Sequence, residues 1–195
     1  MARDVGVEAQ VRDMAGVAAK RFGDIDVLID HAQALFTDHA AIEECPAERR
    51  DRPYQTGIKA ICSCCKAVLP HVKARGGKVI NFGSGRGVKG APGWCDYPGN
   101  KAASRAFSKT AAREWSPYNI QVNLINPAIL TPSFLEFTAK HPEMEEARRR
   151  AGAQLGDPER GAGAAAPWLA SADGASLTGH TVRVGPGGIQ QMSLT

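Results

Sequence analysis

The sequence contains no apolar run long enough to span a membrane, and its first residues include no apolar stretch of the signal-peptide kind. It also lacks a concentrated basic patch, because the lysines and arginines are spread along the chain and the densest run, at 148–150, follows three glutamates. A nucleic-acid-binding surface would need such residues to gather on one face. We therefore expect neither a membrane nor a nucleic acid among its partners.

The spacing of a zinc site is missing as well. The cluster Cys62-Ser63-Cys64-Cys65 lacks the two-residue gap of a zinc knuckle, and no second knuckle follows it. We predict no metal site and expect these cysteines to fill the core of a helix as small hydrophobic side chains. With Cys45 and Cys95 the cysteines number five, and an odd count without a secretion signal predicts reduced thiols in a cytoplasmic protein.

What remains is the composition of an ordinary globular domain. The 195 residues suit a single domain over 1–195, large enough to bury a sizeable core. Hydrophobic residues make up 43% and charged residues 23%, which places the chain outside the disordered and fibrous classes. The formal charge of +4 is too small to indicate a particular partner.

Helical and strand patterns alternate along the chain. The spacing predicts strands over 25–29, 78–82, 121–125 and 181–184, separated by helices over 11–22, 54–69, 101–115 and from 157 onward. We expect Pro70 to stop the second helix and Pro167 to interrupt the last one. Such alternation predicts an α/β fold with a doubly wound parallel sheet. The signals are weakest over 128–156, which we interpret as a mobile substrate flap with a short helix at 143–150.

The strongest chemical pattern is formed by Ser84, Tyr97 and Lys101. Tyr97 and Lys101 stand four residues apart at the start of the Ala-rich helix, so their side chains point the same way. Ser84 follows a predicted strand in the flexible turn Gly83-Ser84-Gly85, and the ends of parallel strands are where ligands bind. An ammonium group beside a phenol lowers its pKa, which predicts a tyrosine that moves protons near neutral pH.

This order of residues resembles the short-chain dehydrogenase/reductase family. The resemblance rests on Ser84, Tyr97-Pro98-Gly99-Asn100-Lys101 and Val122-Asn123-Leu124-Ile125-Asn126-Pro127, and it extends from Phe22-Gly23-Asp24 to Leu177-Thr178-Gly179. It implies that Tyr97 is the acid/base and that Ser84 holds the substrate oxygen. It also implies that Lys101 lowers the tyrosine pKa and binds the nicotinamide ribose of NAD(P).

The resemblance implies further cofactor contacts and shows where this sequence departs from the family. Asp4 and Val5 resemble its adenine-contacting pair, while Pro127 and Thr131 correspond to positions near the nicotinamide. The family's first strands and Gly-rich pyrophosphate loop have no counterpart here, so we expect a shortened Rossmann-like sheet and weak NAD(P) binding. Gly57 stands where the family has a helix asparagine that organises a proton-relay water, and Asp30-His31-Ala32-Gln33 replaces Asn-Asn-Ala-Gly.

A glycine pattern of the dinucleotide-binding kind does occur, at Gly85, Gly87 and Gly90. It is followed by Ala91-Pro92-Gly93, which cannot form the helix that such a fingerprint requires. We interpret it as part of the catalytic-serine loop.

Three functions remain open at this point. The chain is expected to be an oxidoreductase acting on a carbonyl or secondary alcohol of a small molecule, a cofactor-independent hydrolase in which Ser84 is the nucleophile, or an inactive scaffold. In each case we expect a homo-oligomer, a dimer or tetramer, because the predicted strand around Val27-Leu28-Ile29 would form an apolar sheet edge.

Overall fold

The computed structural model describes residues 2–35, 40–150, 152–186 and 188–193, the last range by its backbone alone. Its centre is a five-stranded sheet in which the order of the strands equals their order in the chain. The first four strands are parallel, and the fifth is antiparallel to the fourth. The strands are β1 (Val27–Asp30), β2 (Gly77–Phe82), β3 (Ile120–Pro127), β4 (Thr181–Gly185) and β5 (Gly188–Ser193).

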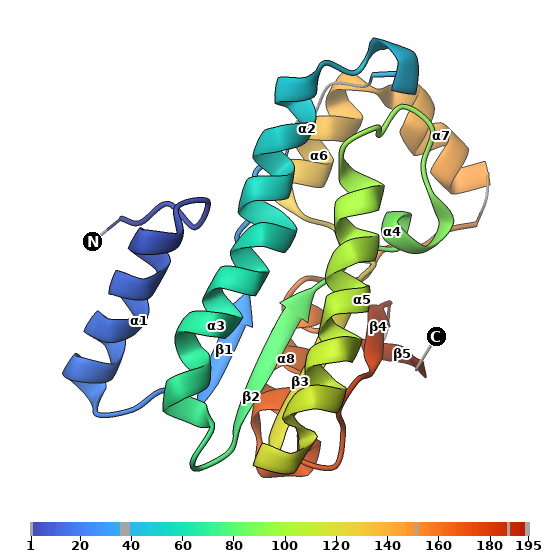
Figure 1. Ribbon diagram of the computed structural model, residues 1–195. Coiled ribbons are helices and arrows are strands. Elements are labelled where there is room, and N and C mark those ends of the chain that lie inside the picture. The colour runs from blue at the N-terminus through green and yellow to red at the C-terminus, as the bar shows by residue number, and fades with distance from the viewer. Residues whose placement is uncertain (1, 36–39, 151, 187, 194–195) are drawn as a thin grey trace.

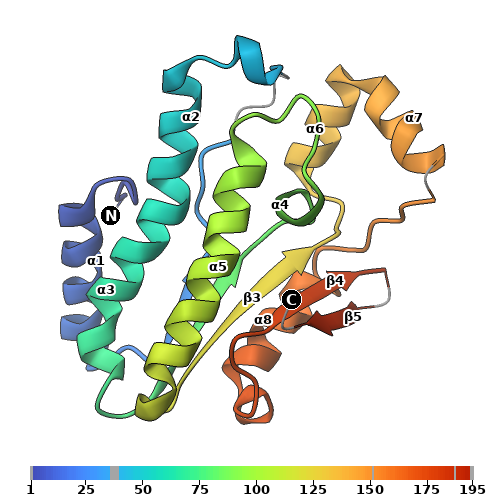
Figure 2. The ribbon, with the colours of Figure 1, turned by 45° about the vertical axis from the view of Figure 1, so that its right-hand side comes forward.

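Helices cover both faces of this sheet (Figures 1 and 2). Three long helices lie on one face: α1 (Glu8–Phe22), α3 (Ala60–Val72) and α5 (Tyr97–Trp115). The opposite face packs against α8 (Ala162–Ala170). Neighbouring strand residues such as Val79 and Ile80 are both buried, one in each core, which explains why this sheet has continuous apolar runs. The predicted doubly wound α/β fold is confirmed.

Shorter elements carry the chain between the strands. They are η1 (Ile42–Glu44), α2 (Ala47–Tyr54), η2 (Gln55–Lys59), α4 (Arg86–Lys89), η3 (Ser116–Tyr118), α6 (Pro132–Lys140), α7 (Pro142–Arg150) and η4 (Ala172–Gly174). The segment 128–156 contains α6 as well as the expected helix α7. None of the described helices is both long and apolar enough to cross a membrane.

Both prolines that were expected to break helices lie inside helices. Pro70 is within α3 and Pro167 within α8. Each proline removes one backbone hydrogen bond and crowds the carbonyl four residues before it, but buried neighbours hold the turn around it: Val68 and Val72 in α3, and Leu169 in α8. Packing therefore outweighs the local preference, and the predictions from Pro70 and Pro167 were wrong.

The prediction of five reduced cysteines was also wrong. Cys45 and Cys95, fifty positions apart, form a disulfide, whereas Cys62, Cys64 and Cys65 are free. The two partners come together because α2 and α5, which begin just after them, lie against each other. Cys64 and Cys65 are buried in α3, as expected for small core side chains.

Candidate active site

The three residues singled out from the sequence meet at the carboxyl ends of β2 and β3. The chain leaves β2 through Gly83, whose amide donates to the carbonyl of Ile125 at 2.7 Å. A Cβ on Gly83 would lie 2.3 Å from the Cδ2 of Leu124, so a larger residue here would have to displace that buried side chain. Ser84 follows, and its Oγ accepts a hydrogen bond from the Arg86 amide at 3.2 Å.

Tyr97 and Lys101 occupy the first turn of α5, which begins earlier than the sequence pattern predicted. The Nζ of Lys101 is buried, donates to the carbonyl of Phe82 at 2.7 Å and lies 5.7 Å from the centre of the Tyr97 ring. The serine loop packs closely on this turn, since a Cβ on Gly87 would lie 2.8 Å from that of Lys101. The structure therefore brings Ser84, Tyr97 and Lys101 together.

The electrostatics of Tyr97 differ from what its spacing to Lys101 suggested. Burial raises the pKa of Tyr97, while a hydrogen bond with Ser84 and the charge of Arg86 act in the lowering direction. Burial also lowers the pKa of Lys101 to about 8. The cation that favours the Tyr97 phenolate is thus Arg86, a residue to which the sequence analysis gave no role.

Arg86 lies against two neighbouring aromatic side chains. Its guanidinium lies 4.1 Å from the centre of the Trp94 ring and 5.8 Å from that of Phe137. Trp94 in turn lies 5.9 Å from Tyr97, measured between ring centres. Arginine stacks well on aromatic faces, and here the stacking fixes the cation beside the candidate acid/base.

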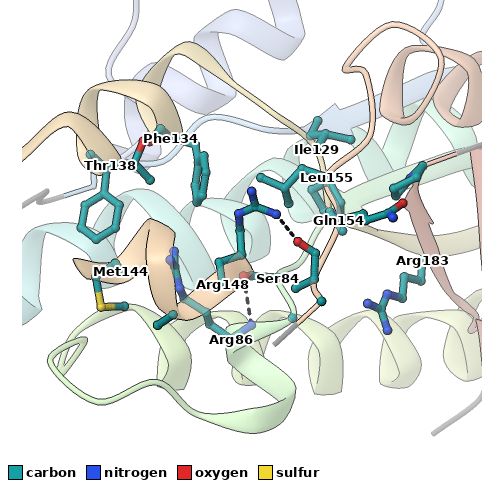
Figure 3. A pocket seen from close by; sticks show the side chains of 18 residues that line it. Ser84, Arg86, Ile129, Phe134, Thr138, Met144, Arg148, Gln154, Leu155 and Arg183 are labelled. Atoms are coloured by element: carbon teal, nitrogen blue, oxygen red, sulfur yellow. Dashed lines mark hydrogen bonds between the residues drawn. The ribbon is translucent and has the colours of Figure 1, made fainter. Parts of the chain in front are cut away.

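Two adjoining cavities open at Ser84. The first, which we call the tyrosine cavity, has a volume of about 570 Å³ and is lined by Tyr97, His31 and Thr131 among others. The second, the flap cavity, has a volume of about 670 Å³ and lies under α6 and α7 (Figure 3). Arg86 and Ser84 line both, so they form part of the wall between them.

The residues expected to contact a cofactor fall into two groups. Pro127, at the end of β3, and Thr131, whose Oγ1 caps α6 by accepting from the Phe134 amide at 3.2 Å, both line the tyrosine cavity. Asp4, Val5 and Lys101 line neither cavity. Asp4 accepts from the Gly6 amide at 2.8 Å and from Arg52 at 3.1 Å, and these contacts lower its pKa.

The ends of β1 and β2 form the far wall of the tyrosine cavity. His31 lies edge-on to Phe82, with 4.5 Å between ring centres, and burial together with the charge of Lys101 lowers its pKa. Asp30 is withdrawn from solvent, and burial raises its pKa from 3.8 to about 7 despite a hydrogen bond with Cys64.

Asn100 is a structural residue that sequence reasoning missed. Its Nδ2 donates to the carbonyl of Pro53 at 2.8 Å and its Oδ1 accepts from the amide of Ile58 at 2.9 Å. The carboxamide thus enters the helix between α2 and α3, where Gly57 has non-helical φ and ψ angles. A Cβ on Gly57 would lie 2.1 Å from the Asn100 Nδ2. Asn100 thus brings a carboxamide to the turn at Gly57.

Comparisons with known proteins decide the family. The model of a family described as Enoyl-(Acyl carrier protein) reductase matches residues 1–188. The 12alpha-hydroxysteroid dehydrogenase of Clostridium sp. is 32% identical over 94% of this chain and 71% of its own length. The chain belongs to the short-chain dehydrogenase/reductase family.

Other members agree in sequence and in fold. Human dehydrogenase/reductase SDR family member 4 is 32% identical over 94% of this chain, which spans about two thirds of that relative, 66% of its length. The crystal structure of NAD+-bound xylitol dehydrogenase superimposes with a TM-score of 0.82 over 95% of this chain and 77% of that one, at 24% identity, and so shows the same fold.

The names of these relatives bear on the three functions that the sequence left open. They are named as dehydrogenases and reductases, which places this chain in a family of oxidoreductases. The hydrolase hypothesis, with Ser84 as a nucleophile, finds no support among them.

Proposed function

We propose that the chain works as an NAD(P)-dependent oxidoreductase that interconverts a carbonyl and a secondary alcohol on a small molecule, with Tyr97 as the acid/base. The observation that carries the proposal is the position of Tyr97 in a cavity at the strand ends that Ser84 also lines, where Ser84 acts to lower the pKa of Tyr97. Ligands of open α/β sheets bind at the carboxyl ends of the strands.

Each side chain then has a definite task. In the direction of reduction, the Tyr97 hydroxyl gives its proton to the carbonyl oxygen of the substrate, and in oxidation the phenolate takes the proton back. Ser84 donates a hydrogen bond to the same oxygen and holds it beside the phenol. Arg86 and Lys101 are the nearby cations, and the charge of Arg86 stabilises the phenolate when Tyr97 has lost its proton.

The tyrosine cavity fits the nicotinamide half of a cofactor, which when bound would supply or accept a hydride. Lys101 has one hydrogen-bond acceptor among the described residues, the Phe82 carbonyl, whereas an ammonium group has three donors. Its remaining donors suit ribose hydroxyl groups, and Pro127 and Thr131 line the cavity where the ring would lie. Asp4 and Val5 would serve the adenine end.

The decisive experiment compares Tyr97→Phe with the matched variant Tyr118→Phe, which removes an exposed hydroxyl far from the site. Turnover of a panel of ketones and secondary alcohols is followed by NADH and NADPH absorbance, and cofactor binding by fluorescence titration. We expect Tyr97→Phe to lower kcat by roughly 10²–10⁴-fold, the contribution of general acid catalysis, while cofactor affinity stays within a factor of about two. Equal turnover of the two variants would refute the role of Tyr97.

A further inference from the structure

The flap cavity contains more positive charge than proton transfer at Tyr97 requires. Three arginines line it, Arg86, Arg148 and Arg183, and Figure 3 shows them around the same space as Ser84. None of the described residues that line this cavity or the tyrosine cavity is an aspartate or a glutamate. A cavity lined by charge of one sign concentrates ligands of the opposite sign.

The three arginines are not equivalent. Arg148 already forms a bidentate pair with Glu145, at 2.7 and 2.8 Å, and also donates to the carbonyl of Ala153. Neither Arg86 nor Arg183 has a hydrogen bond or ion pair from its guanidinium to any residue in the described part of the chain. The unbalanced charge of the cavity therefore comes from Arg86 and Arg183.

The side chain of Arg86 is held in one position before a ligand binds, unlike that of a surface arginine. It is partly buried and stacked on Trp94, which itself packs against Phe137, so little conformational entropy is lost when an anion binds to it. Arg183, in β4, is exposed toward the same cavity. A guanidinium presents donors in a fork that matches the two oxygens of a carboxylate.

The other residues that line the flap cavity indicate the character of the rest of the ligand. Ile129, Phe134, Met144 and Leu155 give the cavity apolar walls. None of the lining residues belongs to β1, the strand beside the nicotinamide half of the site. The cavity is thus placed for the substrate rather than for the phosphates of a cofactor.

We propose that the substrate is a hydroxy acid or oxo acid with an apolar body, whose carboxylate lies in the flap cavity, paired with Arg86 and attracted by the charge of Arg183, while its reacting carbon lies at Ser84 and Tyr97. This inference rests on the proposed function for the reacting carbon, but the carboxylate site itself does not. It makes Arg86 a specificity-determining residue as well as the cation beside Tyr97.

The test measures binding without turnover. Calorimetric titrations with octanoate and with octan-1-ol, which share an apolar chain and differ in the acid group, are run on wild type, Arg86→Gln, Arg183→Gln and Arg50→Gln. Arg50→Gln removes the same charge from an exposed position of α2 and serves as the matched control. Arg86→Lys is added, since it keeps the charge and loses the fork, and circular dichroism checks that every variant is folded.

We expect wild type and Arg50→Gln to bind octanoate roughly tenfold or more tightly than octan-1-ol, the usual effect of charge-assisted hydrogen bonds. The preference should largely disappear in Arg86→Gln, fall in Arg183→Gln and be intermediate in Arg86→Lys. Equal binding of the two probes by wild type, no binding of octanoate, or an unchanged preference in both glutamine variants would overturn the inference.

The same titration on Tyr97→Phe separates this inference from the proposed function. We expect that variant to keep its preference for octanoate, because Tyr97 is not needed to hold the acid group. If wild type prefers octanoate to octan-1-ol but turnover does not depend on Tyr97, the proposed function alone is overturned. If turnover depends on Tyr97 but wild type shows no preference for octanoate, this inference alone is overturned.

Discussion

Asp30 lies at the end of β1 with a carboxyl group whose pKa is raised by burial from 3.8 to about 7. Between roughly pH 4 and pH 7 the folded chain therefore binds more protons at this position than the unfolded chain does. The free energy of unfolding consequently falls as the pH rises through that window, and the loss is complete above the folded pKa.

Asp30→Asn should remove this dependence. We expect its free energy of unfolding, relative to wild type, to increase from pH 4 to pH 7 and then to level off, as measured by urea unfolding over a pH series. Asp51→Asn, an exposed aspartate of α2, is the matched control and should follow the wild-type profile. Parallel profiles for wild type and Asp30→Asn would mean that Asp30 is not protonated in the folded chain.

At the same scale, the sequence predicts which residues meet at the candidate site better than it predicts their electrostatics. Ser84, Tyr97 and Lys101 can be found from spacing because a strand end and one turn of helix fix their relative positions. Arg86 cannot, because its importance depends on Trp94 and Phe137, which other segments bring to it. Contacts between distant segments leave no pattern in a single sequence.

Among the elements, the kinked helix between α2 and α3 depends on a pair of residues that act together. Gly57 makes room for the carboxamide of Asn100, which takes the carbonyl of Pro53 and the amide of Ile58 away from the helical hydrogen-bond ladder. If Asn100 were absent, a regular helix could satisfy both of those groups.

A double-mutant cycle tests this coupling. We expect Gly57→Ala to destabilise the fold by about 1–3 kcal/mol, because its Cβ would overlap Asn100. Gly57→Ala combined with Asn100→Ala should destabilise less than the sum of the single changes by at least about 1 kcal/mol, as found for residues in contact. Urea unfolding of the four proteins measures the coupling, and simple additivity would contradict it.

The disulfide is a second link between elements. Cys45 precedes α2 and Cys95 lies two residues before Tyr97, so the bond joins the entry of α2 to the segment that leads into α5. We expect Cys45→Ser combined with Cys95→Ser to lower the free energy of unfolding by about 2–4 kcal/mol, because the unfolded chain loses a constraint. Reductant should lower the free energy of unfolding of wild type by the same amount and leave that of the double variant unchanged. If reductant lowers both by a similar amount, the disulfide is not the cause of the change.

The elements also show where local patterns fail. The alternation of helices and strands comes from apolar periodicity, which is repeated over many residues and is therefore robust. Pro70 and Pro167 were misread because a proline states only a local preference, whereas the buried turns of α3 and α8 are held by the sheet beneath them. Helix α6 was missed because the segment from 128 to 156 has little periodicity.

The whole molecule has an apolar side along β1 and α1, which lie together at one end of the sheet (Figure 1). Strand β1 is an edge strand, and Val17 and Phe22 of α1 are 46% and 75% exposed. Because an edge strand leaves backbone hydrogen-bonding groups unpaired and exposed apolar surfaces associate, we expect a dimer or tetramer.

Light scattering at micromolar concentration measures this directly. Val17→Lys combined with Phe22→Lys should shift the protein toward the monomer if association uses this side. Lys20→Gln, which changes an exposed polar position of the same helix, should leave the mass unchanged. A monodisperse wild-type monomer would contradict the expectation.

The strand order of the sheet also bears on how the chain is made. Because β1 to β5 are neighbours in the same order in which they are synthesised, each new strand can dock on the last one as it leaves the ribosome. Within the described sheet, no strand has to be inserted between two that are already paired. Assembly of this part of the sheet can therefore follow translation from the N-terminal side.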